Sequence, residues 1–104
     1  MGNVTWTPHA LEDLAAATAC IAEGPPEFAP EFAVRIANAV RHLDEFPQLG
    51  RQVPELEIPS VREVVFSRYR IIYQLRDDAT WIIAVMHGTQ DFSAFAERRK
   101  WNLS

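Results

Sequence analysis

The chain has 104 residues, of which 48% are hydrophobic and 23% charged, with a formal net charge of −4. These values are ordinary for a soluble globular protein, and the length suits one modest core, so residues 1-104 are expected to form a single domain. A membrane-spanning chain is excluded, because no apolar run approaches the ~20 residues that a span needs.

The N-terminus and the cysteine content predict a cytoplasmic protein with no membrane partner. The first eight residues lack the basic and apolar regions of a signal peptide. The single Cys20 cannot form a disulfide within the chain, and its spacing places it on a helix as a small buried hydrophobe.

The first predicted element is a short edge strand, in which Val4 and Trp6 alternate with polar residues. A helix follows, since Thr7 can cap its N-terminus and Pro8 suits the first helical position. Apolar spacings of three and four residues mark its buried face, which consists of Leu11, Leu14, Thr18 and Ile21. Gly24-Pro25-Pro26 is expected to end this helix.

A second amphipathic helix is predicted from near Pro30 until Pro47 ends it. Its apolar stripe consists of Phe32, Ile36, Ala39, Val40, Leu43 and Phe46. Because the connection between the helices is short, they should form an antiparallel hairpin whose apolar stripe covers one face of a sheet.

After a proline-rich connector over residues 47–59, two β-branched and aromatic runs predict a tight antiparallel hairpin. The runs are residues 61–66 and 69–75, and Ser67-Arg68 is the turn, so Phe66 should lie opposite Tyr69. This pairing gives an apolar face (Val64, Phe66, Tyr69, Ile71, Tyr73, Leu75) and a mixed face (Glu63, Val65, Arg70, Ile72, Gln74, Arg76).

A third strand is predicted from Trp81 to His87. A turn centred on Asp78-Ala79 would place Arg70 directly opposite His87, on the mixed face. A slip of one residue would place His87 on the core side instead. The expected fold is therefore α+β: an N-terminal edge strand and an antiparallel helical hairpin packed on an antiparallel sheet of three to four strands.

The pairing of Arg70 and His87 suggests a chemical role. An imidazole beside a guanidinium could act as general acid or base in phosphodiester cleavage, with the guanidinium stabilising the charge on phosphate. The alternative is a strand-end histidine bonded to a nearby backbone carbonyl. The sequence has no phosphate-binding glycine loop and no paired-cysteine metal pattern, and its three histidines are far apart, so no cofactor or metal is expected.

Charge is unevenly distributed along the chain. Residues 1–50 hold two of the ten basic residues, and residues 51–104 hold the other eight. This distribution favours an acidic partner on the sheet side, or else a surface whose charges only keep the protein soluble. Residues 91–103 could form a short basic helix whose apolar residues, Phe92, Phe95 and Trp101, dock on the sheet or remain available to a partner.

The chain resembles the RelE/ParE superfamily of toxins from bacterial type II toxin-antitoxin modules. The resemblance spans about residues 3 to 95 and rests on the order of elements and on short motifs. These are Phe46-Pro47-x-Leu49-Gly50-Arg51, Val53-Pro54-Glu55, Arg62-Glu63, Tyr69-Arg70-Ile71-Ile72-Tyr73 and Val85-Met86-His87-Gly88.

This resemblance implies one of two activities. RelE-like members are ribosome-dependent mRNA endonucleases, usually strongly basic, and a nuclease here would use Arg51, Arg62, Arg70 and His87. ParE-like members poison DNA gyrase through protein contact and serve in plasmid stabilization. In this chain Gln90 stands where a distal arginine is common, and Phe92 and Phe95 lack the hydroxyl of a tail tyrosine. Because the chain has a pI near 5.3, its electrostatic attraction to the ribosome is expected to be weak.

A ParE-like gyrase inhibitor that is not an enzyme is therefore preferred. The alternatives are an mRNA endonuclease and a degenerate toxin that acts only in an antitoxin complex. Direct sequence-specific binding to nucleic acid is not expected. The resemblance also implies a cognate antitoxin, ParD-like in the preferred case. The residues expected to bind protein partners are Arg51, Arg62, Arg70, Arg76, His87, Phe92 and Phe95.

Overall fold

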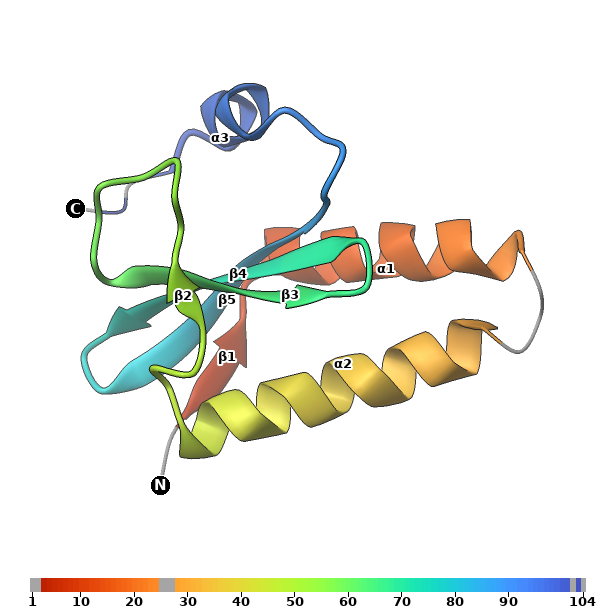
Figure 1. Ribbon diagram of the computed structural model, residues 1–104, viewed down its shortest axis with the longest axis horizontal. Helices are drawn as coiled ribbons and strands as arrows, with labels where there is room; N and C mark the ends of the chain where they lie inside the picture. Colours follow the sequence, from red (N-terminus) through yellow and green to blue (C-terminus); the bar gives the residue numbers. More distant parts are fainter. Residues whose placement is uncertain (1–2, 25–27, 102, 104) are drawn as a thin grey trace.

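The computed structural model in Figure 1 describes residues 3–24, 28–101 and 103. Its helices are α1 (Pro8–Ala22), α2 (Phe28–Glu45) and α3 (Phe92–Arg99). Its strands are β1 (Val4–Trp6), β2 (Arg51–Gln52), β3 (Val61–Phe66), β4 (Tyr69–Arg76) and β5 (Ala79–His87). No helix of the described segments is both long and apolar enough to cross a membrane.

The five strands form one mixed sheet in the order β1-β5-β4-β3-β2. The α+β class, the N-terminal edge strand and the helical hairpin are confirmed. The expected sheet of three to four antiparallel strands is corrected in two ways. Strand β1 runs parallel to β5, and β2, taken from the connector, adds a short fifth strand at the opposite edge.

The β3–β4 hairpin has the expected register. Phe66 lies opposite Tyr69, and Ser67 in the turn adopts a left-handed backbone with φ of 55°. Val64, Phe66, Tyr69, Ile71, Tyr73 and Leu75 all face the helical hairpin, as the alternation of residues predicts.

The register expected between β4 and β5 is wrong. The turn is centred on Asp77-Asp78, both with positive φ, rather than on Asp78-Ala79, and Arg76 lies opposite Ala79. A bulge beside Ile72 and Tyr73 then shifts the pairing by one residue. His87 consequently lies opposite Tyr69, and Arg70 lies opposite Met86 on the other face of the sheet.

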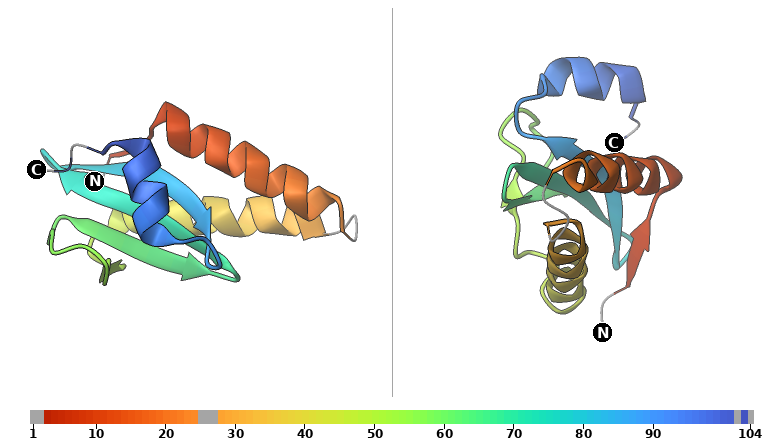
Figure 2. Two further views of the ribbon diagram at one scale, coloured as in Figure 1. Left: turned by 90° about the horizontal axis from the view of Figure 1, so that it is seen from above. Right: turned by 90° about the vertical axis from the view of Figure 1, so that its right-hand side faces the viewer.

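The sheet is covered on both faces (Figure 2). Helices α1 and α2 cover one face, where Ala10, Phe32, Ile36 and Leu43 pack on Ile71, Tyr73 and Ile82. The other face carries α3 and the connector, whose Val53, Phe92 and Phe95 pack on Val61, Ile72, Ala84 and Met86. The tail helix is therefore docked on the sheet.

Several helical expectations need correction at the level of single residues. Leu11 is 50% exposed and Phe46 is 59% exposed, and Ala10 and Ala17 form the buried contacts of α1. Cys20 is exposed rather than buried. Thr7 caps α1 as predicted, and its side-chain oxygen accepts a hydrogen bond from the Ala10 amide. The proposed stop at Pro25-Pro26 lies outside the described residues.

Strand β1 pairs only with the first part of β5, and side chains cover the rest of that edge of β5. Asp13 of α1 accepts a hydrogen bond from the Val85 amide at 3.0 Å, and Arg99 of α3 donates to the Ile83 carbonyl at 3.2 Å. Asp13 and Arg99 also form an ion pair with each other. Helices from the two ends of the chain thus satisfy backbone groups that β1 is too short to reach.

Candidate functional site

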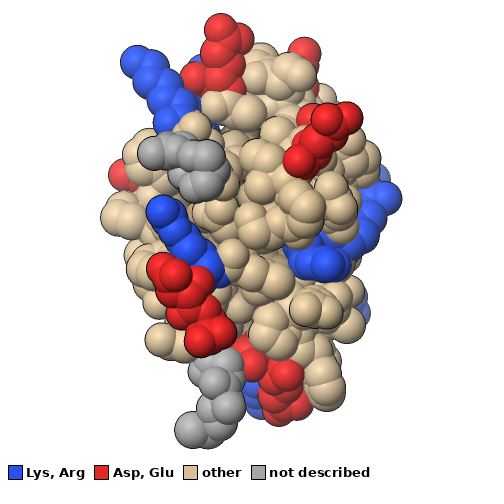
Figure 3. Space-filling view, turned by 90° about the vertical axis from the view of Figure 1, so that its left-hand side faces the viewer, with Lys and Arg blue, Asp and Glu red and all other residues tan. Residues whose placement is uncertain are grey.

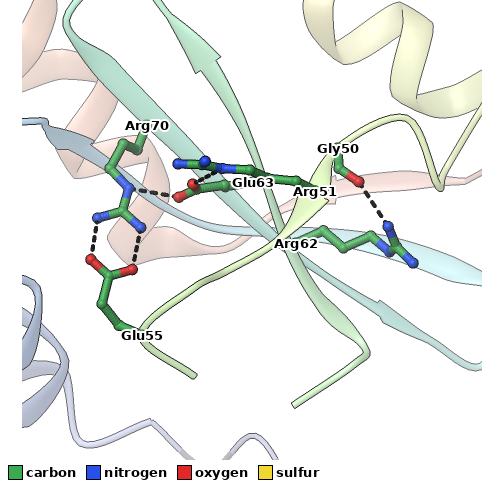
Figure 4. A network of polar contacts seen from close by, with 6 residues as sticks. All are labelled: Gly50, Arg51, Glu55, Arg62, Glu63 and Arg70. Atoms are coloured by element: carbon green, nitrogen blue, oxygen red, sulfur yellow. Dashed lines mark hydrogen bonds and ion pairs between the residues drawn. The ribbon is translucent and has the colours of Figure 1, made fainter. Parts of the chain in front are cut away.

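The strongest polar feature of the sheet is a network centred on Glu63 of β3 (Figure 4). Its carboxylate is fully buried and accepts hydrogen bonds from the Nε atoms of Arg51 at 2.7 Å and Arg70 at 2.6 Å. A buried charge is tolerated only when it is paired, and Glu63 is paired on both oxygens.

Arg70 of β4 is held by three further contacts. Its two terminal nitrogens donate to the Glu55 carboxylate at 2.9 and 2.7 Å, in the bidentate geometry that suits a guanidinium. The guanidinium also lies 5.0 Å from the centre of the Phe92 ring. Only 13% of the side chain is exposed, so all three nitrogens are engaged inside the protein.

The contact between Arg70 and Glu55 shifts both ionisation equilibria toward the charged forms. The hydrogen bond to Arg70 lowers the pKa of Glu55 from its ordinary value of 4.5, although partial burial opposes this shift. The hydrogen bond from Glu55 raises the pKa of Arg70. Both groups therefore remain ionised at neutral pH.

Glu55→Gln is expected to reduce stability above the ordinary carboxyl pKa of 4.5, by less than about 1 kcal/mol, because the pair is partly exposed. A carboxyl with a lowered pKa in the folded state stabilises the protein above its ordinary pKa, and this contribution disappears as pH falls through the folded value. Urea unfolding of both proteins between pH 3 and pH 7 measures the difference. If the two proteins differed in unfolding free energy by the same amount at every pH, the lowered pKa of Glu55 would be contradicted.

Position 50 requires glycine, because the turn over residues 47–50 lies very close to β3 and β4. The Gly50 amide donates to the Tyr73 hydroxyl at 2.9 Å, and that hydroxyl donates to the Pro47 carbonyl at 2.8 Å. A Cβ on Gly50 would lie 2.5 Å from the Glu63 carbonyl oxygen. Burial raises the pKa of Tyr73, so its hydroxyl stays protonated and can donate.

Arg62 lies beside this turn, where one terminal nitrogen donates to the Gly50 carbonyl at 2.8 Å. Its buried Nε has no hydrogen-bond partner among the described residues. Arg62 and Arg51 come from adjoining strands β3 and β2, and Arg51 keeps 63% of its side chain exposed. Of the predicted arginines, Arg51 therefore offers a partner the most accessible charge in this region.

His87 lies apart from the arginine network, at the far end of the sheet and on the helix side. Its ring makes an edge contact with Tyr69 at 5.2 Å between centroids. Its Nδ1 accepts from the Thr89 amide at 3.1 Å and lies 2.7 Å from the Thr89 hydroxyl, so the partner is Thr89 rather than a backbone carbonyl. Gln90 accepts from the His87 amide at 2.9 Å and closes the turn.

A groove of about 560 Å³ surrounds His87, between the open end of the helical hairpin and the β3–β4 turn. Its walls include Phe32, Phe66 and Tyr69, with the cationic side chains of Arg35 and Arg68 at its rim. Arg35 is paired with Glu31 at 2.8 Å, which lowers the positive charge of the rim.

The structure thus separates the predicted site residues into groups. Arg51 and Arg70 converge on Glu63, whereas Arg62 points to the Gly50 carbonyl (Figure 4). His87 lies on the other face of the sheet from Arg70, so the expected row of Arg70 and His87 is wrong. Arg76 is exposed at the start of the β4–β5 turn. Phe92 and Phe95 are buried in the second core and leave little side chain for a partner.

Sequence reasoning missed the roles of Glu55 and Glu63. Strand alternation already placed Glu63 on the same face as Arg70, and this was the available signal for their ion pair. Among the described residues no group of three histidine, cysteine or acidic side chains could hold a metal ion.

Comparison with known proteins identifies the family. A family model described as the ParE toxin of the type II toxin-antitoxin system, parDE, matches residues 4–92. Toxin RelE2 of Caulobacter vibrioides is 34% identical over 91 residues, covering 86% of this chain and 99% of that protein. A putative toxin, Y4kP, of Sinorhizobium fredii is 35% identical over 92 residues, covering 86% of this chain and 92% of that protein.

Solved structures show the same fold. The chromosomal ParDE toxin-antitoxin system of P. aeruginosa contains a chain that matches with a TM-score of 0.69 and 22% identity, over 84% of this chain and 96% of that chain. The toxin-antitoxin complex RelBE2 of Mycobacterium tuberculosis matches with a TM-score of 0.58 and 20% identity, over 83% and 96%. The fold, the family match and the two relatives agree: the chain belongs to the ParE toxin family of type II toxin-antitoxin systems.

Proposed function

We propose that this toxin inhibits DNA gyrase by protein contact, without cleaving RNA, and that a cognate antitoxin neutralises it. The observation that carries the proposal is the internal use of Arg70. Its guanidinium is bound to Glu55 and Glu63, both carboxylates, and cannot stabilise charge on a phosphate without breaking this network.

The position of His87 supports the same proposal. General acid-base catalysis needs the base within hydrogen-bond reach of the proton that it transfers, and a charge-stabilising group must contact the same reacting centre. His87 and Arg70 lie on opposite faces of the sheet, and the Nδ1 of His87 is engaged by Thr89. A nuclease centred on these two residues would therefore need a different arrangement of both.

Antitoxin binding is proposed on the surfaces that combine apolar area with exposed cationic groups. The groove beside His87 supplies aromatic walls with Arg35 and Arg68, and Arg51 is exposed at the edge strand β2. An antitoxin segment with apolar anchors and acidic side chains complements both. The two similar structures are of toxin-antitoxin systems, which supports a partner of this kind. We also propose that residues 1-104 act as one toxin domain.

A supercoiling assay with purified gyrase tests the proposal. Wild-type toxin should block supercoiling and leave mRNA intact in a translation reaction, and His87→Gln should inhibit gyrase within about twofold of wild type. If His87 were a general acid or base, the same change would reduce RNA cleavage by about 10²- to 10⁴-fold.

Two results would contradict the proposal. Unaffected gyrase together with cleaved mRNA would assign the toxin to the nuclease class. Inhibition that persists when the product of the gene adjacent to the toxin gene is added in excess would remove the antitoxin part of the proposal while leaving gyrase as the target.

A further inference from the structure

A second groove lies at the opposite end of the molecule from His87. It has a volume of about 1200 Å³. One side is formed by the C-terminus of α2 and the turn that follows it, and the other side by the β4–β5 turn. We call it the acidic groove. The residues that matter for its chemistry are Asp44, Glu45, Phe46, Leu49, Asp77 and Asp78. Neither the arginine network nor the His87 groove shares any of them.

The walls of the acidic groove are apolar and exposed. Phe46 is 59% exposed and Leu49 is 56% exposed, although both are large hydrophobic residues. They are held in place, because the Phe46 amide donates to the His42 carbonyl at 2.7 Å and the Leu49 amide donates to the Phe46 carbonyl at 2.9 Å. Their exposure is thus a property of an ordered turn, and such a surface is typical of a contact site.

The rim of the groove carries a strong negative charge. Four carboxylates line it, against a single guanidinium, that of Arg76. In the described part of the chain, none of the four is in an ion pair, whereas Asp13, Glu31, Glu55 and Glu63 are all paired. Figure 3 looks onto this end of the molecule and shows, in its lower half, two groups of acidic side chains, each beside a basic side chain.

Two of these carboxylates belong to a tight turn. Asp77 and Asp78 form the whole turn of the β4–β5 hairpin, with φ of 51° and 62°. Aspartate and asparagine tolerate this left-handed geometry better than most residues, so the turn keeps its shape when the charge is removed. Both sides of the groove are therefore built from hydrogen-bonded turns.

We propose that the acidic groove binds a basic, amphipathic peptide segment of a partner protein. Its apolar anchor would contact Phe46 and Leu49, and Lys or Arg side chains flanking the anchor would meet the unpaired carboxylates. Charge complementarity identifies the occupant, since an acidic segment would be repelled here and attracted to the arginine surfaces. The proposal goes beyond the gyrase and antitoxin assignments and depends on neither.

Peptide display tests this inference directly. Purified full-length toxin is used to select from a random library of dodecapeptides, and the most enriched peptide is labelled and titrated by fluorescence anisotropy at low and high salt. Selected peptides should be rich in Lys or Arg next to an aromatic or aliphatic residue, and binding should weaken at high salt.

Variants locate the binding site. Peptide affinity should fall at least tenfold in the double variant Asp77→Asn/Asp78→Asn and also in Phe46→Ala. The circular dichroism spectrum should not change in either variant. Glu12→Gln/Glu97→Gln removes the same charge from exposed positions elsewhere and should bind within twofold of wild type. Peptides without an excess of basic residues, or equal affinity for all variants, would overturn the proposal. Self-association of the toxin that is lost in Phe46→Ala would assign the groove to a second copy and would also overturn it.

Discussion

Gly50→Ala is expected to destabilise the protein by about 3 kcal/mol, in the upper range for overpacking a buried site. The new Cβ would lie 2.5 Å from the Glu63 carbonyl oxygen and 2.6 Å from the Tyr73 hydroxyl. The first of these atoms belongs to the backbone of β3, which cannot move away without disturbing its pairing with β4. Urea unfolding monitored by circular dichroism, with equal m-values, measures the loss.

Two further variants make this test specific. Gly24→Ala is the matched control, since its Cβ would have its nearest contact at an ordinary 3.4 Å, and its stability should change by less than about 0.5 kcal/mol. Tyr73→Phe removes the hydroxyl that Gly50→Ala would strike, so the double variant should lose less than the sum of the two single losses. Strict additivity would show that the clash with the Tyr73 hydroxyl is not part of the cause.

Glu63→Gln is expected to cost about 3 kcal/mol, because it removes the charge that two guanidinium groups share in a fully buried position. An amide can still accept on one side, but its NH₂ group would face an arginine nitrogen. Arg70 would remain largely buried, with Glu55 as its only carboxylate partner. The loss should be measured by urea unfolding at pH 7.

Glu57→Gln provides the control, since it removes an equal charge from an exposed position on the connector that precedes β3 and should change stability by less than about 0.5 kcal/mol. Replacing both partners, as in Glu63→Leu/Arg70→Met, should recover much of the loss, because apolar side chains of similar volume need no ionic partner. If Glu63→Gln unfolds at the same urea concentration as wild type, the network is not a stabilising unit.

Local patterns in the sequence predicted the elements that depend on neighbouring residues. The β3–β4 hairpin follows from two β-branched runs around Ser67-Arg68, and its register and both faces were correct. The start of α1 follows from Thr7 and Pro8. In these segments the turn chemistry and the period of the strands agree, so a single sequence is sufficient.

The features that were missed depend on geometry that no local pattern encodes. The turn at Asp77-Asp78 requires two left-handed residues, and aspartate signals this only weakly compared with Asn-Gly. The bulge that shifts His87 to the other face carries no glycine to mark it. The parallel pairing of β1 and the contact of Glu55 with Arg70 join segments far apart in the chain, one of them an irregular connector.

The contact of Asp13 and Arg99 with the edge of β5 has a consequence for biosynthesis. The two residues are separated by 86 positions, and β1 pairs with a strand that begins at Ala79. A chain emerging from the ribosome N-terminus first can form its helical hairpin early, but its sheet cannot close before β5 is free, and the edge of β5 cannot be covered before Arg99 is free. The sheet is therefore completed late in synthesis, and a chain truncated before Arg99 leaves part of a strand edge unpaired.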